Sequence, residues 1–244
     1  MTVTTPAGFR AGGVAAGIRA AGAPDLALVV NDGPIRAAAG VLTANRVRAA
    51  PVLWTQQVLS TGRLSAVVLN SGGANACTGP AGFADTHATA EKVAAALAID
   101  PVDVAVCSTG LIGERLPMEA ILTGVEKAAA ALSGTGGDAA ARGTMTTDSL
   151  PKTSARRAEE GFTVGGMAKG AGMLAPGLAT MLSVLTTDAV ADAATLDAAL
   201  RKATGRTFDR VDSDGCMSTN DTVLLLASGA SGVRPGPDAF TEVL

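Results

Sequence analysis

The feature that most constrains the fold is a series of short, largely apolar runs separated by turn residues and by segments of helical spacing. These runs cover residues 25–30, 38–43, 65–69, 102–107, 180–185 and 222–227. Continuous apolar runs of this length are typical of strands that are buried on both faces. We therefore expect strands covered by other layers, and we expect the run 38–43 to be the partner of the run 25–30.

Several segments between the runs place apolar residues three and four positions apart, as on one face of a helix. In residues 86–99 these are Ala90, Val93, Ala94 and Leu97, and a proline, Pro117, opens a similar pattern further on. We expect helices over 86–99, 117–128, 138–144 and 195–208, and a polar loop over 156–161. Strands that alternate with helices predict an α/β or α+β fold, with layered mixed sheets and flanking helices.

Composition excludes several classes of function. The chain has 244 residues, a net charge of −3 and no run of Lys and Arg, which argues against a nucleic-acid partner. No window approaches the roughly 20 apolar residues of a membrane helix. Charged residues from Arg10 to Asp25 interrupt any signal peptide. We expect a cytoplasmic protein that contacts neither nucleic acid nor membrane.

The spacing of the cysteines and the single histidine does not suggest a metal centre. Cys77, Cys107 and Cys216 are widely spaced, which predicts buried free thiols and neither a disulfide framework nor a zinc site. His87 is the only histidine, and its neighbours read as the start of a helix, so we expect it to cap that helix or to lie on the surface.

The most unusual passage is residues 165–182, where glycines surround a single cation, Lys169, and lead through Pro176 to Thr180. Part of it matches a dinucleotide-binding fingerprint loosely. However, Pro176 and the strand that follows prevent the helix that such a site requires. The phosphate-loop pattern is absent.

The run from Lys169 to Leu182 resembles the cleavage-site signature of the ornithine acetyltransferases, also called glutamate N-acetyltransferases. Further matching stretches occur in family order across nearly the whole chain. They are Ala7-Gly8-Phe9, Gly13-Val14, residues 25–29, residues 70–79 (NSGGANACTG), residues 108–113 (STGLIG), residues 145–148 (MTTD) and residues 218–222 (STNDT).

The resemblance implies a self-processing, N-terminal-nucleophile-like architecture. The chain would cut itself between Ala179 and Thr180, giving an α chain of residues 1–179 and a β chain whose first part is residues 180–244. Thr180 would then be the nucleophile. A free α-amino group has an unperturbed pKa of roughly 7.7–8, so that of Thr180 can accept the hydroxyl proton without a histidine.

Further site residues follow from the same resemblance. The Thr109 hydroxyl and the Gly110 N–H would stabilise an oxyanion, and Thr146, Lys169 and Thr180 would contact substrate. Lys169 could pair with a substrate carboxylate. Asn75 and Lys152 lie in matching stretches but receive no role.

The implied activity is transfer of an acetyl group from N2-acetyl-L-ornithine to L-glutamate, a step of arginine biosynthesis that yields ornithine and N-acetylglutamate. No metal or cofactor is implied, although some members also accept acetyl-CoA as the acetyl donor. Family members form pairs of αβ units, a heterotetramer, and they continue well beyond residue 244, so we expect this sequence to be truncated at its C-terminus.

Two other functions remain open. A related self-processing amidohydrolase or aminopeptidase would pass the acyl group to water in place of glutamate. A small-molecule-binding fragment would keep the glycine-rich loop without chemistry and would stay in one piece.

Overall fold

Two stacked β-sheets form the centre of the molecule in the computed structural model, which describes residues 1–19, 22–175 and 181–244. The first sheet, sheet A, has the strand order β1-β2-β4-β5. Its strands are β1 (Phe9–Val14), β2 (Leu26–Asn31), β4 (Ala66–Gly73) and β5 (Val104–Leu111). β2 pairs antiparallel with β1 and β4, whereas β4 and β5 are parallel, so the two latter strands end at the same edge.

The second sheet, sheet B, has the order β3-β9-β8-β7-β6. Its strands are β3 (Ala37–Leu42), β9 (Thr222–Ala227), β8 (Leu182–Thr187), β7 (Thr163–Lys169) and β6 (Lys152–Arg157). β8 and β9 are parallel and the other pairs are antiparallel. The end of β7 therefore lies beside the beginnings of β8 and β9.

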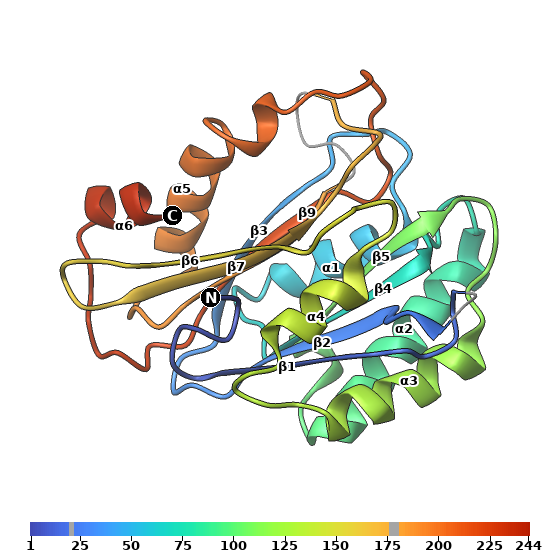
Figure 1. Cartoon of the computed structure of the whole chain (residues 1–244), viewed down its shortest axis with the longest axis horizontal. Coiled ribbons are helices and arrows are strands. Elements are labelled where there is room, and N and C mark those ends of the chain that lie inside the picture. The colour runs from blue at the N-terminus through green and yellow to red at the C-terminus, as the bar shows by residue number, and fades with distance from the viewer. Residues whose placement is uncertain (20–21, 176–180) are drawn as a thin grey trace.

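Helices cover the stack on its outer faces and along its edges (Figure 1). They are α1 (Ala50–Leu59), α2 (Gly79–Leu97), α3 (Met118–Ala130), α4 (Gly137–Thr144), α5 (Ala193–Thr204) and α6 (Pro237–Val243), with 3₁₀ turns at Pro101–Asp103 and Phe208–Arg210. α2 and α3 pack on sheet A and α5 packs on sheet B, with α6 beside it. α1 contacts β5 and β3, and α4 contacts β1, β2 and β7, so these two helices tie the sheets together along opposite edges.

The alternation of side chains along β9 shows how both faces of sheet B are buried. Leu224 and Leu226 point into the core between the sheets, whereas Val223 and Leu225 belong to the apolar cluster beneath α5. A strand that is apolar at successive positions is the sequence signal of such two-sided burial. The expected layered α/β architecture is confirmed.

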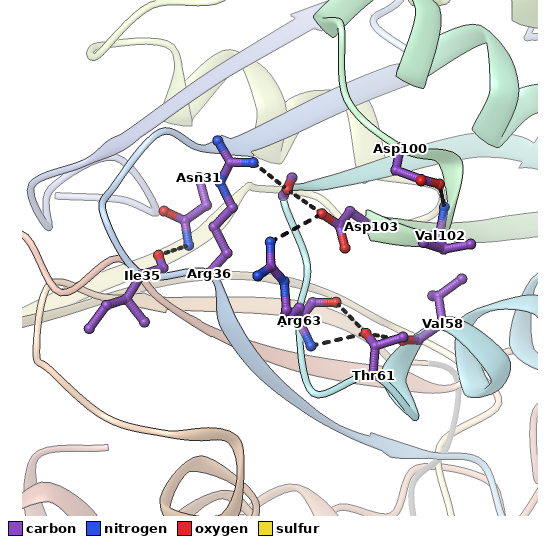
Figure 2. A network of polar contacts seen from close by, with 10 residues as sticks. Asn31, Ile35, Arg36, Val58, Thr61, Arg63, Asp100, Val102 and Asp103 are labelled. Atoms are coloured by element: carbon purple, nitrogen blue, oxygen red, sulfur yellow. Dashed lines mark hydrogen bonds and ion pairs between the residues drawn. The ribbon is translucent and has the colours of Figure 1, made fainter.

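A polar network joins the two sheets at the end where β3, β4 and β5 begin. Figure 2 shows Arg36, which precedes β3, and Asp103, which precedes β5. Arg36 Nη1 donates to Ser65 Oγ at 3.1 Å, and Ser65 Oγ donates to Asp103 Oδ2 at 3.1 Å. Arg63 Nη2 lies 3.6 Å from the same carboxylate. These contacts fix the position of the first residues of β4 and β5, in sheet A, relative to the first residues of β3, in sheet B.

The predicted pairing of residues 38–43 with 25–30 is wrong. β3 lies in sheet B against β9, while β2 lies in sheet A. The turn after β2 crosses from one sheet to the other. Asn31 N donates to Ser65 O just before β4 in sheet A, and Ile35 N donates to Ser228 O just after β9 in sheet B. The connection thus changes layer instead of closing a hairpin.

Other expectations need adjustment at their ends. Residues 156 and 157 belong to the exposed edge strand β6 and not to a loop. The helix expected from residue 86 begins at Gly79, and the one expected over 195–208 ends at Thr204. The strands β1, β6 and β7 and the helix α1 were not predicted.

The single histidine and two of the cysteines lie at the surface. His87 is inside α2 with a half-exposed side chain 3.8 Å from Glu91, which confirms a surface role and not a capping one. Only Cys107 is a buried thiol, because Cys77 and Cys216 are exposed in loops. No described helix is long and apolar enough to cross a membrane.

Candidate active site

The candidate site lies where the ends of β5 and β7 meet the beginnings of β8 and β9. Here, too, polar groups join the sheets. Asn220 Nδ2, just before β9, donates to Ala74 O at 2.6 Å and to Ser108 O at 2.8 Å. Lys169 Nζ, at the end of β7, donates to Thr109 Oγ1 on β5 at 3.0 Å. Two of the residues expected at the site, Thr109 and Lys169, are thus in direct contact.

Thr109 and Gly110 form the carboxyl end of β5. Gly110 has φ +131°, and a Cβ there would lie 2.4 Å from the carbonyl carbon of Gly72 on the neighbouring strand, so only glycine fits. Thr109 is buried and Gly110 is exposed. They border a cavity of about 20 Å³ together with Ala74, Ile112, Met173, Ser218, Thr219 and Asn220.

Lys169 is a buried cation, with only 2% of its surface exposed. Burial lowers its pKa from the ordinary value, and the negative charges of Asp148 and Asp221 oppose that effect. A buried ammonium is costly unless carboxylates and acceptors surround it. This lysine has both, since the two carboxylates lie nearby and Thr109 accepts its hydrogen bond.

Asp221 is a fully buried carboxylate that directly contacts the residue after Thr180. Its Oδ1 accepts the N–H of Met181 at 2.8 Å, and among the described residues its Oδ2 has no hydrogen-bond partner. Burial raises the pKa of Asp221 to about 6, against the opposing effects of the Met181 N–H, the nearby Ser218 and Thr43 side chains and the charge of Lys169. Sequence reasoning did not single out this residue, although an Asn-Asp pair directly before an apolar strand was a usable signal.

Asp148 holds the segment that carries Thr146 against the start of the glycine-rich loop. It accepts the N–H of Gly170 at 2.8 Å and that of Thr146 at 3.3 Å, and it pairs with Lys152. Burial would raise the pKa of Asp148, but these partners hold it below its ordinary value. Thr146, half-buried, is therefore linked through Asp148 to the residue after Lys169.

A second set of contacts fixes Met145, the neighbour of Thr146. Arg19 Nη1 donates to Met145 O at 2.7 Å. The buried carboxylate of Asp25 in turn accepts four backbone N–H groups, from residues 16 to 19. This explains how a loop distant in sequence holds the expected substrate-contacting segment.

The segment 213–221 holds both flanks of the predicted cleavage site. Before it, Met173 N donates to Asp214 Oδ2 at 2.8 Å, and Ser213 N donates to Leu174 O at 2.9 Å. After it, Met181 N donates to Asp221. Ala179 and Thr180 themselves lie outside the described residues. The structure thus brings Thr109, Gly110 and Lys169 together, with Thr146 linked to them through Asp148.

The class of protein follows from comparing this fold, two stacked mixed sheets with the candidate site at the end they share, with solved structures. A solved aminopeptidase from Ochrobactrum anthropi, described as a variant of the Ntn hydrolase fold, matches with a TM-score of 0.55 at 14% identity, over 93% of this chain and 73% of that chain. The chain has the fold of the N-terminal-nucleophile hydrolases. The ArgJ family model matches residues 10–244, and the chain belongs to the ArgJ family.

Close relatives carry the name arginine biosynthesis bifunctional protein ArgJ. That of Mycobacterium leprae is 67% identical over 240 residues, which are 96% of this chain and 59% of that protein. That of Streptomyces coelicolor is 66% identical over 244 residues, which are all of this chain and 63% of that protein. The chain thus spans about three fifths of the length of the relatives it matches.

A solved structure of ornithine acetyltransferase complexed with ornithine, from Mycobacterium tuberculosis, is 64% identical with a TM-score of 0.71. The match covers 74% of this chain and 96% of that chain. An ArgJ structure from Bacillus halodurans is 34% identical with a TM-score of 0.62, covering 75% of this chain and 95% of that chain.

Proposed function

We propose that the full-length protein cuts its own chain between Ala179 and Thr180 and then transfers acetyl groups from N2-acetylornithine to glutamate. One observation carries the proposal: in a chain of the ArgJ family, buried Lys169 contacts Thr109 beside Gly110, where the flanks of the cleavage site are held. On this proposal residues 1–179 form the α chain and residues 180–244 begin the β chain.

Self-cleavage begins with attack of Thr180 Oγ on the carbonyl carbon of Ala179. The amide becomes an ester and the nitrogen of Thr180 becomes a free amine. Water then hydrolyses the ester, leaving a carboxylate on Ala179 and restoring the hydroxyl of Thr180. The product carries its own base, because the new α-amino group belongs to the same residue as the hydroxyl, Thr180, and has a pKa of roughly 7.7–8 when unperturbed.

Acetyl transfer uses the same hydroxyl in two steps. Thr180 Oγ attacks the acetyl carbonyl of N2-acetylornithine while its proton passes to the α-amino group. The oxyanion is stabilised by Thr109 Oγ–H and Gly110 N–H, and the ornithine nitrogen leaves with the proton. The amine of glutamate then attacks the acetyl-Thr180 ester, and N-acetylglutamate is released. Thr146 and Lys169 are the proposed substrate contacts.

The relatives support this proposal. The Mycobacterium tuberculosis protein is described as an ornithine acetyltransferase complexed with ornithine. The matched chains of both family structures correspond to about three quarters of this chain, and residues 1–179 are also about three quarters of its 244 residues. Chains separated at residue 179 would give such matches.

Several finer points belong to the same proposal. The word bifunctional in the relatives' name fits acetyl-CoA as a second acetyl donor. The pairing of two αβ units, which the resemblance implies, and the cytoplasmic location stay predictions.

The test uses a protein of the relatives' full length, of which this chain spans about three fifths. Intact mass under denaturing conditions should show two chains, the first ending at Ala179, and Thr180→Ala should give one uncut chain. With N2-acetylornithine, N-acetylglutamate should form only when glutamate is present.

Each alternative gives a different result in the same experiment. Acetate and ornithine released at an equal rate without glutamate would indicate an amidohydrolase. An uncut wild-type chain that forms no acetyl-enzyme would indicate a binding protein and would end the proposal.

A further inference from the structure

The contact between Lys169 and Thr109 has a direction that constrains the hydroxyl. An ammonium group has three N–H donors and no acceptor, so in the 3.0 Å bond the oxygen of Thr109 must accept. The hydroxyl proton is then directed away from Lys169. Thr109 also borders the small cavity that Gly110 lines.

We infer that Lys169 is a positioning residue for the oxyanion site: its ammonium fixes the Thr109 hydroxyl so that the hydroxyl proton faces the reacting carbonyl oxygen. This inference rests on the proposed acyl-transfer function and deepens it. It gives Lys169 a role that does not depend on a carboxylate of the substrate.

The surroundings of both residues are rigid enough for such a role. Lys169 is held in β7, where it is paired with Leu182 on β8. Thr109 is held in β5, paired with Ser71 and Gly73 on β4. The bond therefore joins two sheets whose relative position is fixed nearby by Asn220 and at the far end by the network around Asp103. Donors held on rigid strands need little reorganisation in the transition state.

Burial lowers the pKa of Lys169, and the carboxylates around it oppose that effect by favouring the ammonium form. Asp148 and Asp221 both act on it with negative charge, while Lys152 acts in the opposite sense. Lys152 is itself paired with Asp148 and half-exposed, which weakens its effect. A cation beside the hydroxyl also polarises it, which strengthens its hydrogen bond to a developing negative charge.

A carboxylate-binding lysine and a positioning lysine predict different substrate dependence. Removing a carboxylate contact raises KM for N2-acetylornithine and leaves a substrate without a carboxylate unaffected. Removing a positioning residue lowers kcat for both, because the oxyanion forms with every acetyl donor. p-Nitrophenyl acetate is a suitable second donor, since it has neither carboxylate nor amine.

The experiment compares Lys169→Met, Thr109→Val and the double variant in the full-length protein. Formation of acetyl-Thr180 is followed by the mass of the β chain after mixing with either donor. We expect K169M and T109V each to slow acetylation by about 100-fold with both donors, as for loss of one oxyanion donor. In the T109V background, K169M should slow acetylation by less than about threefold more, because the effects of residues that act as a unit do not add.

Two controls isolate the contact. Thr109→Ser keeps the hydroxyl, so K169M should still have its full effect there. Lys92→Met makes the same chemical change at a surface lysine that pairs with Glu126, and it should leave both rates unchanged.

If K169M prevents maturation, the rate of self-cleavage becomes the readout. Cleavage also forms an oxyanion, at the Ala179 carbonyl, and no substrate carboxylate takes part. The double variant should then cleave no more slowly than T109V alone, while far-UV circular dichroism shows a folded chain.

The inference is overturned if K169M keeps the wild-type rate with p-nitrophenyl acetate and only raises KM for N2-acetylornithine. It is also overturned if the effects of K169M and T109V multiply. Failure of the proposed function looks different, since the wild-type protein itself would form no acetyl-Thr180.

Discussion

Asp221 shows how a single residue can combine structural and chemical demands at this site. Its side chain is fully buried, one oxygen holds the main chain of Met181, and the other has no partner among the described residues. Burial of a carboxylate favours its protonated form, which explains the direction of its pKa shift. The nearby charge of Lys169 only partly offsets this cost.

This shift makes a signed prediction for stability. The pKa of Asp221 rises from 3.8 to about 6 on folding, so the folded state binds the proton more tightly. The protonated Asp221 therefore contributes to the free energy of unfolding. This contribution is fully present below pH 4 and is lost as the pH rises through 6. A shift of two units corresponds to about 3 kcal/mol.

Urea unfolding at several pH values tests this point in the uncut T180A background, where a single chain unfolds. From pH 4 to 7, the stability of the protein with Asp221 should fall by about 2–2.5 kcal/mol relative to Asp221→Asn. The asparagine can still accept the Met181 N–H but does not ionise in this range. A difference between the two proteins that is constant with pH would contradict the prediction.

At the residue scale, part of the candidate active site could be recognised from the sequence, and part could not. Lys169 was visible because a single cation among glycines is an unusual pattern. Thr109 was named only through the family resemblance, since Ser-Thr-Gly read alone is a turn. Asp221 and Asn220 were not singled out, because their roles depend on which strand ends meet in space. No local pattern specifies that meeting.

At the scale of elements, polar side chains join the two sheets at both ends. Arg36, Ser65 and Asp103 make the connection where β4 and β5 begin (Figure 2). Asn220 and Lys169 make it where β5 and β7 end. The apolar core between these ends sets the spacing of the layers, while the polar contacts set their register.

Asn220 provides a test of this arrangement. Asn220→Asp removes the two N–H donors that satisfy Ala74 O and Ser108 O and places a carboxylate against both carbonyl groups. We expect a loss of about 2–4 kcal/mol in the free energy of unfolding, together with slower acetylation.

The matched control is Asn45→Asp. Asn45 Nδ2 donates to Met217 O at 3.2 Å in an exposed position, so water can replace the lost donor. Its unfolding free energy should change by less than about 1 kcal/mol. Equal effects of the two substitutions would argue against a joining role for Asn220.

Strands were predicted where a continuous apolar run indicated burial on both faces, whereas the buried, glycine-containing β7 and the exposed β6 were missed. The runs that became β2, β4, β5 and β9 are covered on both faces and were found. β6 is an exposed edge strand with charged residues, which protects the edge of a sheet but reads as a loop. The partner of β3 was mispredicted because the layer change after Asn31 is a tertiary feature that turn residues alone do not reveal.

At the scale of the whole molecule, the proposed α and β chains share one core. Residues of the second chain, such as Leu182 and Leu224, belong to the same apolar cluster as Leu26 and Val67 of the first. After cleavage this cluster holds the chains together, so wild type and uncut T180A should elute at the same volume in gel filtration.

Refolding should separate these two proteins. Before cleavage, β7 and β8 are joined by a short connection, which keeps the entropy cost of pairing them low. Afterwards the same pairing requires two polypeptides to meet. We expect T180A to regain its native circular dichroism after dilution from urea, and the cut protein to refold slowly, with concentration-dependent yield. Equal recovery of both at low concentration would contradict this view.

The strand order of sheet B also affects how the two chains of the cut protein can separate. β9 and β8, from the proposed second chain, lie between β3 and β7 of the first. Strands of the second polypeptide are thus inserted in the middle of a sheet whose outer strands belong to the first, and they can leave only if two strand pairings open at once. Departure would expose bare edges on both partners, which invites aggregation. We therefore expect the working lifetime of the cut protein to follow the rate at which the sheet opens, and not an exchange of subunits.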